Sequence, residues 1–504
     1  MSEATAFGPS AQARAFLAEP HALLIGGAFV EGRSETVIEV EDPSTETVIA
    51  KVRAASIEDV DAAVAAARKA LPLWSGTPGA DRARIMLRFA DLLERDAARL
   101  AEIESLENGM PISLSGATIA GFCADYVRYY AGLATKLEGA TIPARANGRE
   151  MLDLLVYTVR EPVGVVGAIV PWNVPISMII LKLAPALASG CTLVLKSAEL
   201  TPLTSILVAR LWLEAGGPEG VFNVIHGHGH DIGAALVAHP GVNKISFTGS
   251  TAVGKEIVRA VSYDLKRVTL ELGGKSPFVI FPDADLADAI PSAAMACFFL
   301  SGQNCMAGTR LFVHEAVADA VIEGIAQTAN FLKVGPGLDP STMIGPLVSA
   351  RQKARVLEHV AAAKAEGATL AHAGQVPDGP GHFVAPTVFR DVAPSMKLAR
   401  EEVFGPVLGV QVFKDGDDAG LLAAINDTTY GLSGSVWTKD LTRAHRMARA
   451  IDSGQVGVNV HAALSPETPF GGNRQSGWGR EFGREGIDAY LKTKAISVNL
   501  GPIG

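Results

Sequence analysis

The chain has 504 residues, of which 48% are hydrophobic and 19% charged, and both proportions are near those of globular proteins. A net charge of −9 gives no general attraction to phosphate polymers, which argues against a nucleic-acid partner. Four cysteines without a CxxC pair exclude a disulfide framework, a zinc ribbon and a thioredoxin-type site. The length allows about three domains or two large ones.

Residues 1–20 are small and polar, lack the build of a secretory signal, and are predicted to form a loose arm of a cytoplasmic protein. Short strands are expected over 21–41, before a turn at Asp42-Pro43. From Ser56 to Gly139 apolar residues recur at helical spacing, with Ser56 as an N-cap. The apolar stretch 163–181 is long enough for a membrane span. Because two glycines and two prolines interrupt it, a strand, a turn and a buried helix start explain it better, and we expect no membrane association.

After residue 152, apolar strands alternate with helices. Strands are predicted at 192–196, 222–225, 244–249 and 277–281, with helices at 201–215, 231–238 and 251–260. A seam at Gly273-Gly274 precedes a second such run, with helices at 286–300, 316–331 and 350–366 and strands at 310–314, 405–413 and 433–438. This alternation is typical of open α/β sheets with helices on both faces.

Three residues suit the chemistry of a carbonyl group. Small neighbours in GQNCMA would let a carbonyl approach Cys305, although a lone cysteine is more often a small buried apolar residue. Glu271 lies between two leucines, where burial would raise its pKa and suit a general base; alternatively, the Gly-Gly amides satisfy it. Asn173 lies between two prolines and is suited to donate to an oxyanion, or to form an Asx turn.

Other segments suit a nucleotide. Lys196 and Glu199 follow a strand end, where they would meet sugar hydroxyls or simply be solvated charges. Ser250 opens a helix after a strand and a tight turn, a site for phosphate. The segment 227–233 misses the GxGxxG spacing by one residue. Three alternating histidines from His226 to His230 raise the question of a metal, but they have no carboxylate partners there, and we predict a loop and no metal.

Seven segments together resemble the NAD(P)-dependent aldehyde dehydrogenase superfamily: PWN, KSAE, FTGST, ELGGKSP, GQNC, EEVFGPV and PFGG occur in the family's order and approximate spacing. The resemblance runs from about Leu24 to Leu500. It implies an α/β fold with two Rossmann-like open-sheet domains and a small β extension for oligomerisation. The implied NAD-binding domain is 1–140 and 160–274, the catalytic domain 275–474, and the arm and tail 141–159 and 475–504. A homodimer or homotetramer is expected.

The resemblance also implies roles. Cys305 is the nucleophile, Asn173 and the Cys305 N–H form the oxyanion hole, and Glu271 activates the water that hydrolyses a thioester. Lys182 and Glu481 form a proton relay. The implied cofactor-binding residues are Trp172, Lys196 and Glu199 (adenosine ribose), Gly229, Ser250 (pyrophosphate), Gln352 (ribose), Glu402 (nicotinamide ribose) and Phe404 (beside the ring). Because a carboxylate at Glu199 would repel a 2′-phosphate, NAD is predicted rather than NADP.

The implied aldehyde tunnel carries no formal charge. Its residues are Val174, Met178, Leu181, Asn304, Met306, Leu464 and Phe470. A dicarboxylate semialdehyde would require an arginine and an aminoaldehyde an acidic or aromatic cage, so an uncharged hydrophobic aldehyde is predicted. The segment 458–466 resembles phenylacetaldehyde dehydrogenases, although Val460 replaces their usual cysteine and Arg474 a common lysine.

Other functions are open at this point. A semialdehyde dehydrogenase is one, and a CoA-acylating dehydrogenase is another, although a hydrolytic base at Glu271 would waste its thioester. A catalytically silent binding protein on the same fold is less favoured, because Cys305, Glu271 and Asn173 occur together.

Overall fold

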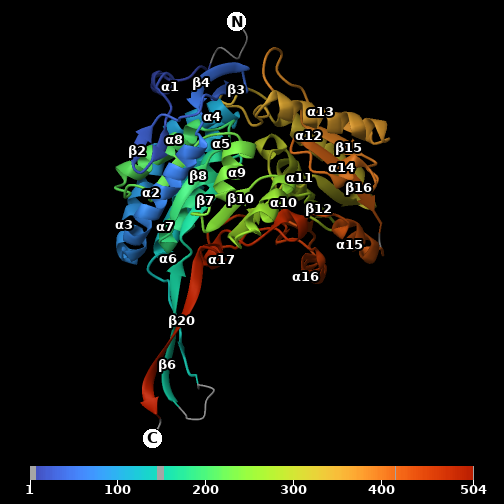
Figure 1. Ribbon diagram of the computed structural model, residues 1–504. Helices are drawn as coiled ribbons and strands as arrows, with labels where there is room; N and C mark the ends of the chain where they lie inside the picture. The colour runs from blue at the N-terminus through green and yellow to red at the C-terminus, as the bar shows by residue number, and fades with distance from the viewer. Residues whose placement is uncertain (1–6, 145–151, 415, 503–504) are drawn as a thin grey trace.

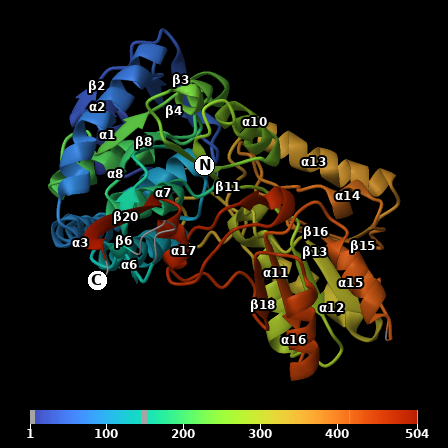
Figure 2. The ribbon, with the colours of Figure 1, turned by 60° about the horizontal axis from the view of Figure 1, so that its bottom comes forward.

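The computed structural model describes residues 7–144, 152–414 and 416–502. Two lobes are each built on an open sheet, and a slender β arm projects from the first lobe (Figure 1). A turned view separates the lobes, with α2 and α8 on one side and α12 and α16 on the other (Figure 2). The predicted α/β class with two open sheets and a small β extension is confirmed.

The first sheet has the strand order β19-β11-β10-β7-β8-β9-β1-β2. Its five central strands are parallel: β7 (Val165–Ile169), β8 (Thr192–Lys196), β9 (Phe222–Ile225), β10 (Lys244–Thr248) and β11 (Arg267–Glu271). Short antiparallel strands close the edges: β1 (Leu23–Ile25), β2 (Ala28–Val30) and β19 (Gly477–Trp478). Since helices cover both faces, β7, β8 and β9 are buried along their whole length.

The helices of the first lobe follow the predicted order. They are α2 (Ile57–Gly76), α3 (Gly79–Arg95), α4 (Ala97–Asn108), α5 (Ile112–Ala117), α6 (Ala124–Leu133), α7 (Pro175–Ser189), α8 (Leu203–Glu214), α9 (Ala234–Ala238) and α10 (Thr251–Val261), with π-helical turns η2 (Thr118–Cys123) and η3 (Gly229–Gly233). Ser56 and Asp59 form the capping box of α2. The apolar stretch 163–181 becomes β7, a turn and the buried start of α7, as predicted. Among the described helices, none has the length and hydropathy that a membrane span needs.

The prediction that the N-terminal segment is a loose arm is wrong for its described part. Residues 1–6 lie outside the described residues, but α1 (Ala11–Leu17) is a helix rather than a loose segment. The Ser10 hydroxyl caps it by accepting from Ala13 N at 3.0 Å. Phe16 is 1% exposed and contacts the His21 ring edge-on, at 5.0 Å between ring centres. Buried Phe16 and Ala13, with Ser10 donating to Glu102 Oε2 at 2.8 Å, therefore fix the segment. The expected turn at Asp42-Pro43 joins β3 (Val37–Asp42) to β4 (Thr47–Arg53).

The second sheet has the order β14-β15-β16-β13-β12-β17-β18. Its strands are β12 (Pro277–Ile280), β13 (Arg310–His314), β14 (Thr369–Ala373), β15 (Thr387–Arg390), β16 (Val407–Phe413), β17 (Ser433–Trp437) and β18 (Gln455–Val458). The accompanying helices are α11 (Leu286–Phe298), α12 (Ala318–Phe331), α13 (Ala350–Ala365), α14 (Lys397–Arg400), α15 (Asp418–Asn426) and α16 (Leu441–Ala450). Every helix and strand predicted after residue 285 is present.

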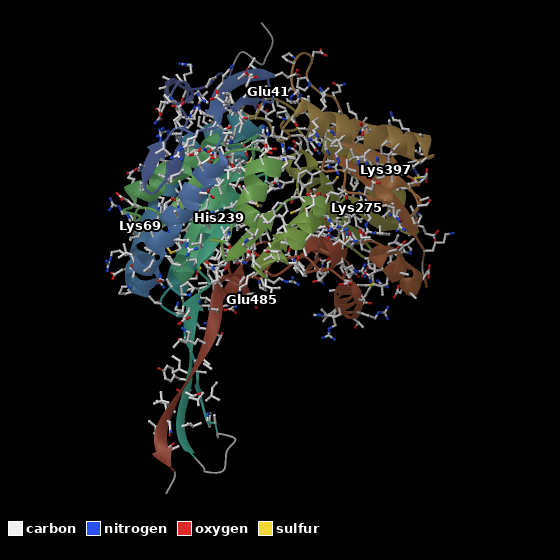
Figure 3. All side chains as sticks on the ribbon, viewed as in Figure 1. Glu41, Lys69, His239, Lys275, Lys397 and Glu485 are labelled. Atoms are coloured by element: carbon white, nitrogen blue, oxygen red, sulfur yellow. The ribbon has the colours of Figure 1, made fainter. Side chains whose placement is uncertain are left out.

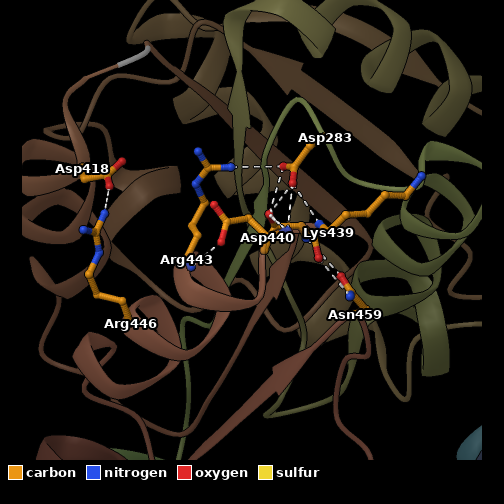
Figure 4. Close-up of polar contacts among 8 residues, drawn as sticks. Asp283, Asp418, Lys439, Asp440, Arg443, Arg446 and Asn459 are labelled. Atoms are coloured by element: carbon orange, nitrogen blue, oxygen red, sulfur yellow. Dashed lines mark hydrogen bonds and ion pairs between the residues drawn. The ribbon is translucent and has the colours of Figure 1, made fainter.

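A carboxylate just after β12 secures the start of α16 (Figure 4). Asp283 Oδ2 accepts from the amides of Lys439 and Asp440 at 2.9 and 3.0 Å, and Asp283 Oδ1 accepts from Arg443 at 3.2 Å. Arg446 of α16 pairs in turn with Asp418 of α15. These contacts attach α15 and α16 to the sheet of the second lobe.

The arm is a three-stranded antiparallel sheet. Its strands are β20 (Leu491–Pro502), β6 (Leu152–Pro162) and β5 (Thr141–Ile142). Glu485, on the short helix α17 (Gly483–Asp488), marks where the arm leaves the body (Figure 3). The predicted tail 475–504 is divided, because β19 completes the first sheet and only β20 enters the arm. Part of the predicted arm, 145–151, lies outside the described residues.

Candidate active site

A cavity of about 330 Å³ lies between the lobes, at the carboxyl ends of the first sheet's strands. This volume suits a small-molecule site. The first lobe contributes Pro171, Trp172, Asn173, Met178, Glu199, Leu200, Thr248, Gly249, Ser250, Glu271, Leu272 and Gly273. The second contributes Cys305, Val348, Ser349, Arg351, Gln352, Arg355, Glu402 and Phe404. Residues far apart in sequence therefore share one cavity.

Cys305 follows a strained turn at the end of α11. Leu300 and Ser301, in the 3-10 turn η4 (Phe299–Gly302), have φ angles of 55° and 58°, and the Ser301 hydroxyl donates to Gly345 O at 2.8 Å. A Cβ at Gly274 would lie 2.3 Å from the Cys305 carbonyl oxygen, so only glycine permits this approach. Burial, reinforced by the nearby carboxylates of Glu402 and Glu271, raises the pKa of the Cys305 thiol to about 12. The thiol must therefore give its proton to a base before it can attack as a thiolate.

Asn173 points its side-chain amide at the loop that carries Cys305. Its Nδ2 donates to Gln303 O at 2.9 Å, and the residue is 7% exposed. Asn108, at the end of α4, holds the loop of Asn173 from behind by donating to Trp172 O at 2.5 Å and to Asn173 O at 3.2 Å. Asn108 was not among the residues predicted for the site. Its only sequence signal is the step Asn108-Gly109, where the helix ends in a left-handed glycine.

Glu271 is the last residue of β11 and is 4% exposed. Neither carboxylate oxygen accepts a well-formed hydrogen bond from the described part of the chain. The alternative that the Gly-Gly amides satisfy it is wrong for Gly274, whose N–H donates to Glu402 Oε1 at 2.9 Å instead. A Cβ at Gly471 would lie 2.7 Å from Glu271 Oε1, which explains a glycine in the PFGG motif. Burial and the Glu481 carboxylate raise the pKa of Glu271 well above its ordinary value, although Lys182 lowers it.

Lys182 and Glu481 meet beside Glu271. The Lys182 ammonium of α7 donates to Glu481 Oε1, and the two side chains are 0% and 7% exposed. Both lie near enough to shift the pKa of Glu271. The structure thus brings together the two residues expected to form a relay with the buried carboxylate that they would serve.

Of the residues expected near the adenosine, Glu199 and Ser250 line the cavity, and Lys196 does not. Lys196 Nζ pairs with Glu199 Oε2 at 3.2 Å. The Ser250 hydroxyl caps α10 by accepting from Val253 N at 3.4 Å. Gly229 begins η3 and does not line this cavity, but its neighbour His228 and Glu199 both line an adjoining one.

The three alternating histidines do not converge. His226 is buried with its Nδ1 2.8 Å from the Ser197 hydroxyl, and burial lowers its pKa to about 3. The rings of His228 and His230 stack at 5.5 Å on the surface. Within residues 7–144, 152–414 and 416–502, no group of three or more potential ligands is placed to hold a metal.

Glu402, Phe404 and Gln352 line the cavity near Cys305. Gln352 Nε2 donates to Phe404 O at 2.8 Å, and Phe404 has a left-handed φ of 58°. The Phe404 ring meets Trp172 edge-on, at 5.4 Å between ring centres. Strain of this kind persists where surrounding contacts enforce it, as at binding sites. Burial raises the pKa of Glu402 to about 6.

The predicted tunnel residues divide into groups. Met178 lines the cavity, and Met306 and Leu464 are partly buried against the core that Cys305 also contacts. Leu181 and Phe470 are 5% and 7% exposed and belong to that core. Val174 is half-buried, and Asn304 accepts from Met306 N at 3.1 Å. Val174, Leu181, Asn304, Met306, Leu464 and Phe470 stand outside the lining of the cavity as the described residues define it.

Two further residues were not predicted, one in the core that Cys305 contacts and one on the loop after Cys305. Phe122, on the π-helical turn η2, packs partly buried against the same core. His461 Nε2 donates to Met306 O at 2.9 Å, while its Nδ1 lies 2.9 Å from the Ser435 hydroxyl. His461 therefore fixes the backbone just after the cysteine.

Comparisons with known proteins agree with this geometry. The model of the family described as "Aldehyde dehydrogenase family" matches residues 29–496. A putative aldehyde dehydrogenase, DhaS, of Bacillus subtilis (strain 168) is 43% identical over 487 residues, which are 96% of this chain and 97% of that protein. An aldehyde dehydrogenase of Enchytraeus buchholzi is 43% identical over 480 residues, 94% of this chain and 95% of that protein. A solved NAD+ complex of an aldehyde dehydrogenase from Bacillus cereus has a TM-score of 0.94 and 42% identity, covering 98% of this chain and 99% of that chain.

Proposed function

Since the chain belongs to the aldehyde dehydrogenase family, we propose that it oxidises an uncharged hydrophobic aldehyde to the carboxylic acid, with NAD as the hydride acceptor. The observation that carries the proposal is that Cys305, Glu271 and Asn173 line one cavity from three distant segments. The relative whose title names an NAD+ complex is 42% identical.

The cavity residues fit a dinucleotide. Buried Thr248 Oγ1, beside the Ser250 cap, has no hydrogen-bond partner in the described chain, and free amides open α10 nearby. Burial alone would raise the pKa of Glu199, but Lys196 outweighs it and holds this pKa below the ordinary value. Glu199 is therefore a carboxylate that can accept from a ribose hydroxyl. Glu402 offers a second carboxylate near Cys305.

The chemistry follows from the residues around Cys305. The thiolate attacks the aldehyde carbon and forms a thiohemiacetal, whose oxygen would be held by Asn173 Nδ2 and the Cys305 N–H. A bound NAD would supply the hydride acceptor, and loss of the hydride from the thiohemiacetal would leave a thioester on Cys305. Glu271 then removes a proton from water, which attacks the thioester and releases the acid. An elevated pKa suits Glu271, since it takes a proton most effectively near the working pH.

The substrate class rests on the side chains around Cys305. Met178 lines the cavity, Met306 follows Cys305 in the chain, and Leu464 and Phe122 pack partly buried against the same hydrophobic core. Behind the cavity lining, Phe122 and Phe470 add aromatic residues to that core through contacts with Phe482, at 5.8 and 5.6 Å between ring centres. A charged aldehyde would lose its hydration against such a wall without gaining a partner. Aromatic and medium aliphatic aldehydes, phenylacetaldehyde among them, are the proposed substrates.

A panel assay tests the function. NADH formation is measured with acetaldehyde, hexanal, phenylacetaldehyde and succinic semialdehyde, with and without CoA. We expect the highest kcat/KM for hexanal or phenylacetaldehyde, without any requirement for CoA. A preference for succinic semialdehyde would contradict the substrate class. Dependence on CoA would indicate an acylating enzyme, and silence with tight NAD binding would indicate a binding protein.

Glu199→Gln should relax the choice of cofactor. The neutral amide keeps the shape but no longer repels a 2′-phosphate, so the ratio of kcat/KM for NAD to that for NADP should fall by roughly tenfold, which is the effect of about 1.4 kcal/mol. Both cofactors are assayed with one aldehyde. As a control, Glu219→Gln, an exposed change elsewhere in the lobe, should leave the ratio unchanged. An equal loss with both cofactors would show that Glu199 does not discriminate between them.

Binding of NAD should weaken in mild acid. Burial raises the pKa of Glu402 to about 6, so the carboxylate that accepts from a ribose hydroxyl is present above pH 6 and is lost as the pH falls below it. The dissociation constant for NAD, measured by calorimetry from pH 5 to 8, should rise below pH 6. Glu402→Gln should bind more weakly at pH 8 and should lose this pH step. A step of unchanged size in the variant would assign it to another group.

The arm is the proposed oligomerisation element. Apolar side chains on its strands stay exposed in the single chain, Leu155 by 42% and Leu500 by 59%. An exposed strand edge with such residues invites pairing with another chain. A homodimer or homotetramer is proposed, to be measured by light scattering of the full chain.

A further inference from the structure

The end of α4 carries three polar side chains that are almost completely buried. Glu104, Glu107 and Asn108 are 2%, 1% and 2% exposed. Asn108 is the last residue of the helix, and Gly109 continues the chain with a left-handed φ of 85°. Polar groups buried to this degree need hydrogen-bond partners, and all three residues have theirs on other segments of the chain.

Two of these side chains cap helices. Glu104 Oε1 accepts from Ile176 N at 3.0 Å in the first turn of α7, and Glu107 Oε1 accepts from Thr204 N at 3.1 Å in the first turn of α8. A carboxylate at a helix N-terminus is a common stabilising arrangement. Asn108 differs from both, because it donates to carbonyl oxygens of the loop that precedes α7.

Asn108 fixes the backbone of the residue expected to hold the oxyanion. Its Nδ2 donates to Trp172 O at 2.5 Å and to Asn173 O at 3.2 Å, and its Oδ1 accepts from Met110 N at 3.0 Å. Beyond this loop, Asn173 Nδ2 donates to Gln303 O at 2.9 Å. An amide nitrogen carries two N–H groups, so the second can meet an oxyanion. The Asn173 amide is therefore held at its backbone and at its tip.

The turn after Asn108 also contacts the segment that supports Cys305. A Cβ at Gly345 would lie 2.0 Å from Gly109 O, so the two segments touch backbone to backbone. Gly345 O in turn accepts from the Ser301 hydroxyl at 2.8 Å, in the strained turn before Cys305. Direct contacts thus lead from one short turn to the loop of the nucleophile and to the loop of the oxyanion amide.

An oxyanion hole works only when its donors are held where the negative charge develops. Here the two expected donors come from different lobes, the Asn173 amide from the first and the Cys305 N–H from the second. In a preorganised site, a displacement of about 1 Å can cost about 10²-fold in rate. The rate should therefore depend on the contacts that hold one loop against the other.

We propose that Asn108 is a positioning residue, which fixes the Asn173 amide relative to Cys305. The inference rests on the proposed function. Asn108 is absent from the described lining of the cavity, so it acts through Asn173 and not on the substrate. Its loss should slow both steps in which an oxyanion forms, the attack of the thiolate on the aldehyde and the attack of water on the thioester. KM should change little, as expected for an interaction made in the transition state.

Two substitutions of different size test the hydrogen bonds of Asn108. Asn108→Leu keeps the approximate size of the side chain, and Asn108→Ala removes most of it. With NAD and the best aldehyde of the panel, kcat should fall about tenfold in both, less than the 10²–10³-fold for loss of an oxyanion donor itself. The burst of NADH in stopped flow should slow as well. Ser105→Ala is the matched control and should keep the wild-type kcat, because Ser105 is 1% exposed on the same helix and its hydroxyl has no partner in the described chain.

A double-mutant cycle separates positioning from damage to the fold. If Asn108 acts only through the Asn173 amide, its loss should cost nothing more once that amide is gone. Asn108→Leu combined with Asn173→Ala should therefore match the kcat of Asn173→Ala alone within about twofold. A general structural defect would instead multiply the two losses.

The other side of the turn gives a test that leaves α4 unaltered. Gly345→Ala would place a Cβ against Gly109 O and push the turn away from the second lobe. Both kcat and the rate of the burst should fall, as in Asn108→Leu. Gly116→Ala on α5 is the control, since its Cβ would have no neighbour nearer than 3.8 Å, and it should keep the wild-type rates.

Three results would overturn the inference. Wild-type kcat in both Asn108 variants would show that the side chain is dispensable. Losses that multiply in the double variant would show that Asn108 does not act through Asn173. A slower turnover with an unchanged burst would place the effect after the thioester and outside a shared oxyanion hole. Absence of NADH formation by the unaltered enzyme with every aldehyde would overturn the proposed function itself, and this inference with it.

Discussion

Replacing Cys305 by alanine is expected to lower kcat for aldehyde oxidation by at least about 10⁴-fold, since removal of a nucleophile leaves only binding and electrostatic assistance. Among the described residues, Cys305 is the only cysteine that lines the cavity between the lobes, and it is only partly buried. Without its sulfur, the aldehyde cannot form the covalent adduct that holds the reacting carbon in place. Steady-state NADH formation with phenylacetaldehyde measures the effect, and calorimetry should show unchanged NAD binding.

Cys297→Ala is the matched control. Cys297 lies eight residues earlier in the chain. It is completely buried in the core of the second lobe and does not line the cavity. It should keep its activity while losing a little stability, because a small buried side chain has been shortened. Activity of Cys305→Ala within tenfold of the wild type would exclude a covalent mechanism at this site.

Glu271→Gln is expected to lower steady-state kcat by roughly 10²–10⁴-fold, the range for loss of a general base. The amide has the shape of the carboxylate but cannot accept a proton from water. Chemistry up to the thioester does not need that step, so the first turnover should still release about one NADH per active site. Rapid mixing with NAD and phenylacetaldehyde would resolve this burst from the slow turnover that follows.

The pH dependence of the wild type gives a second measurement of Glu271. Burial raises its pKa, so the active carboxylate is lost as the pH falls through a value above the usual range of glutamate. Turnover should therefore rise with pH across that raised pKa, and the rise should vanish in Glu271→Gln. Exposed Glu485→Gln on α17 should keep the wild-type profile. If Glu271→Gln slowed the burst and the turnover by the same factor, Glu271 would act before the thioester forms.

The course of the backbone was largely predictable, because its signals are local. The strands expected at 192–196 and 222–225 coincide with β8 and β9, where short apolar runs end at glycines or charged residues. The helix α1 was not predictable, since its stability depends on distant partners. Phe16 lies beneath the guanidinium groups of Arg99 and Arg210, at 5.8 and 5.3 Å from its ring centre. No sequence pattern within residues 7–20 predicts these contacts.

In the candidate site too, residues in local motifs could be predicted, and residues that act through distant contacts could not. Cys305, Glu271 and Asn173 stand in short motifs whose glycines and prolines can be recognised in the sequence. The three residues line one cavity, as expected. Asn108 and His461 act on backbone carbonyls of segments 64 and 155 residues away, so no local pattern marks them.

The interleaving of the chain termini also bears on how the protein is synthesised. The first lobe begins near the N-terminus, yet its sheet is completed by β19, and Glu481 joins Lys182 across 299 residues. Domains that are continuous in sequence can fold as they leave the ribosome, one after another. Here the sheet of the first lobe stays incomplete until the second lobe has been synthesised and the last residues have left the ribosome. We expect newly made chains to depend on chaperones during that interval, and C-terminal truncations before residue 477 to accumulate as insoluble protein.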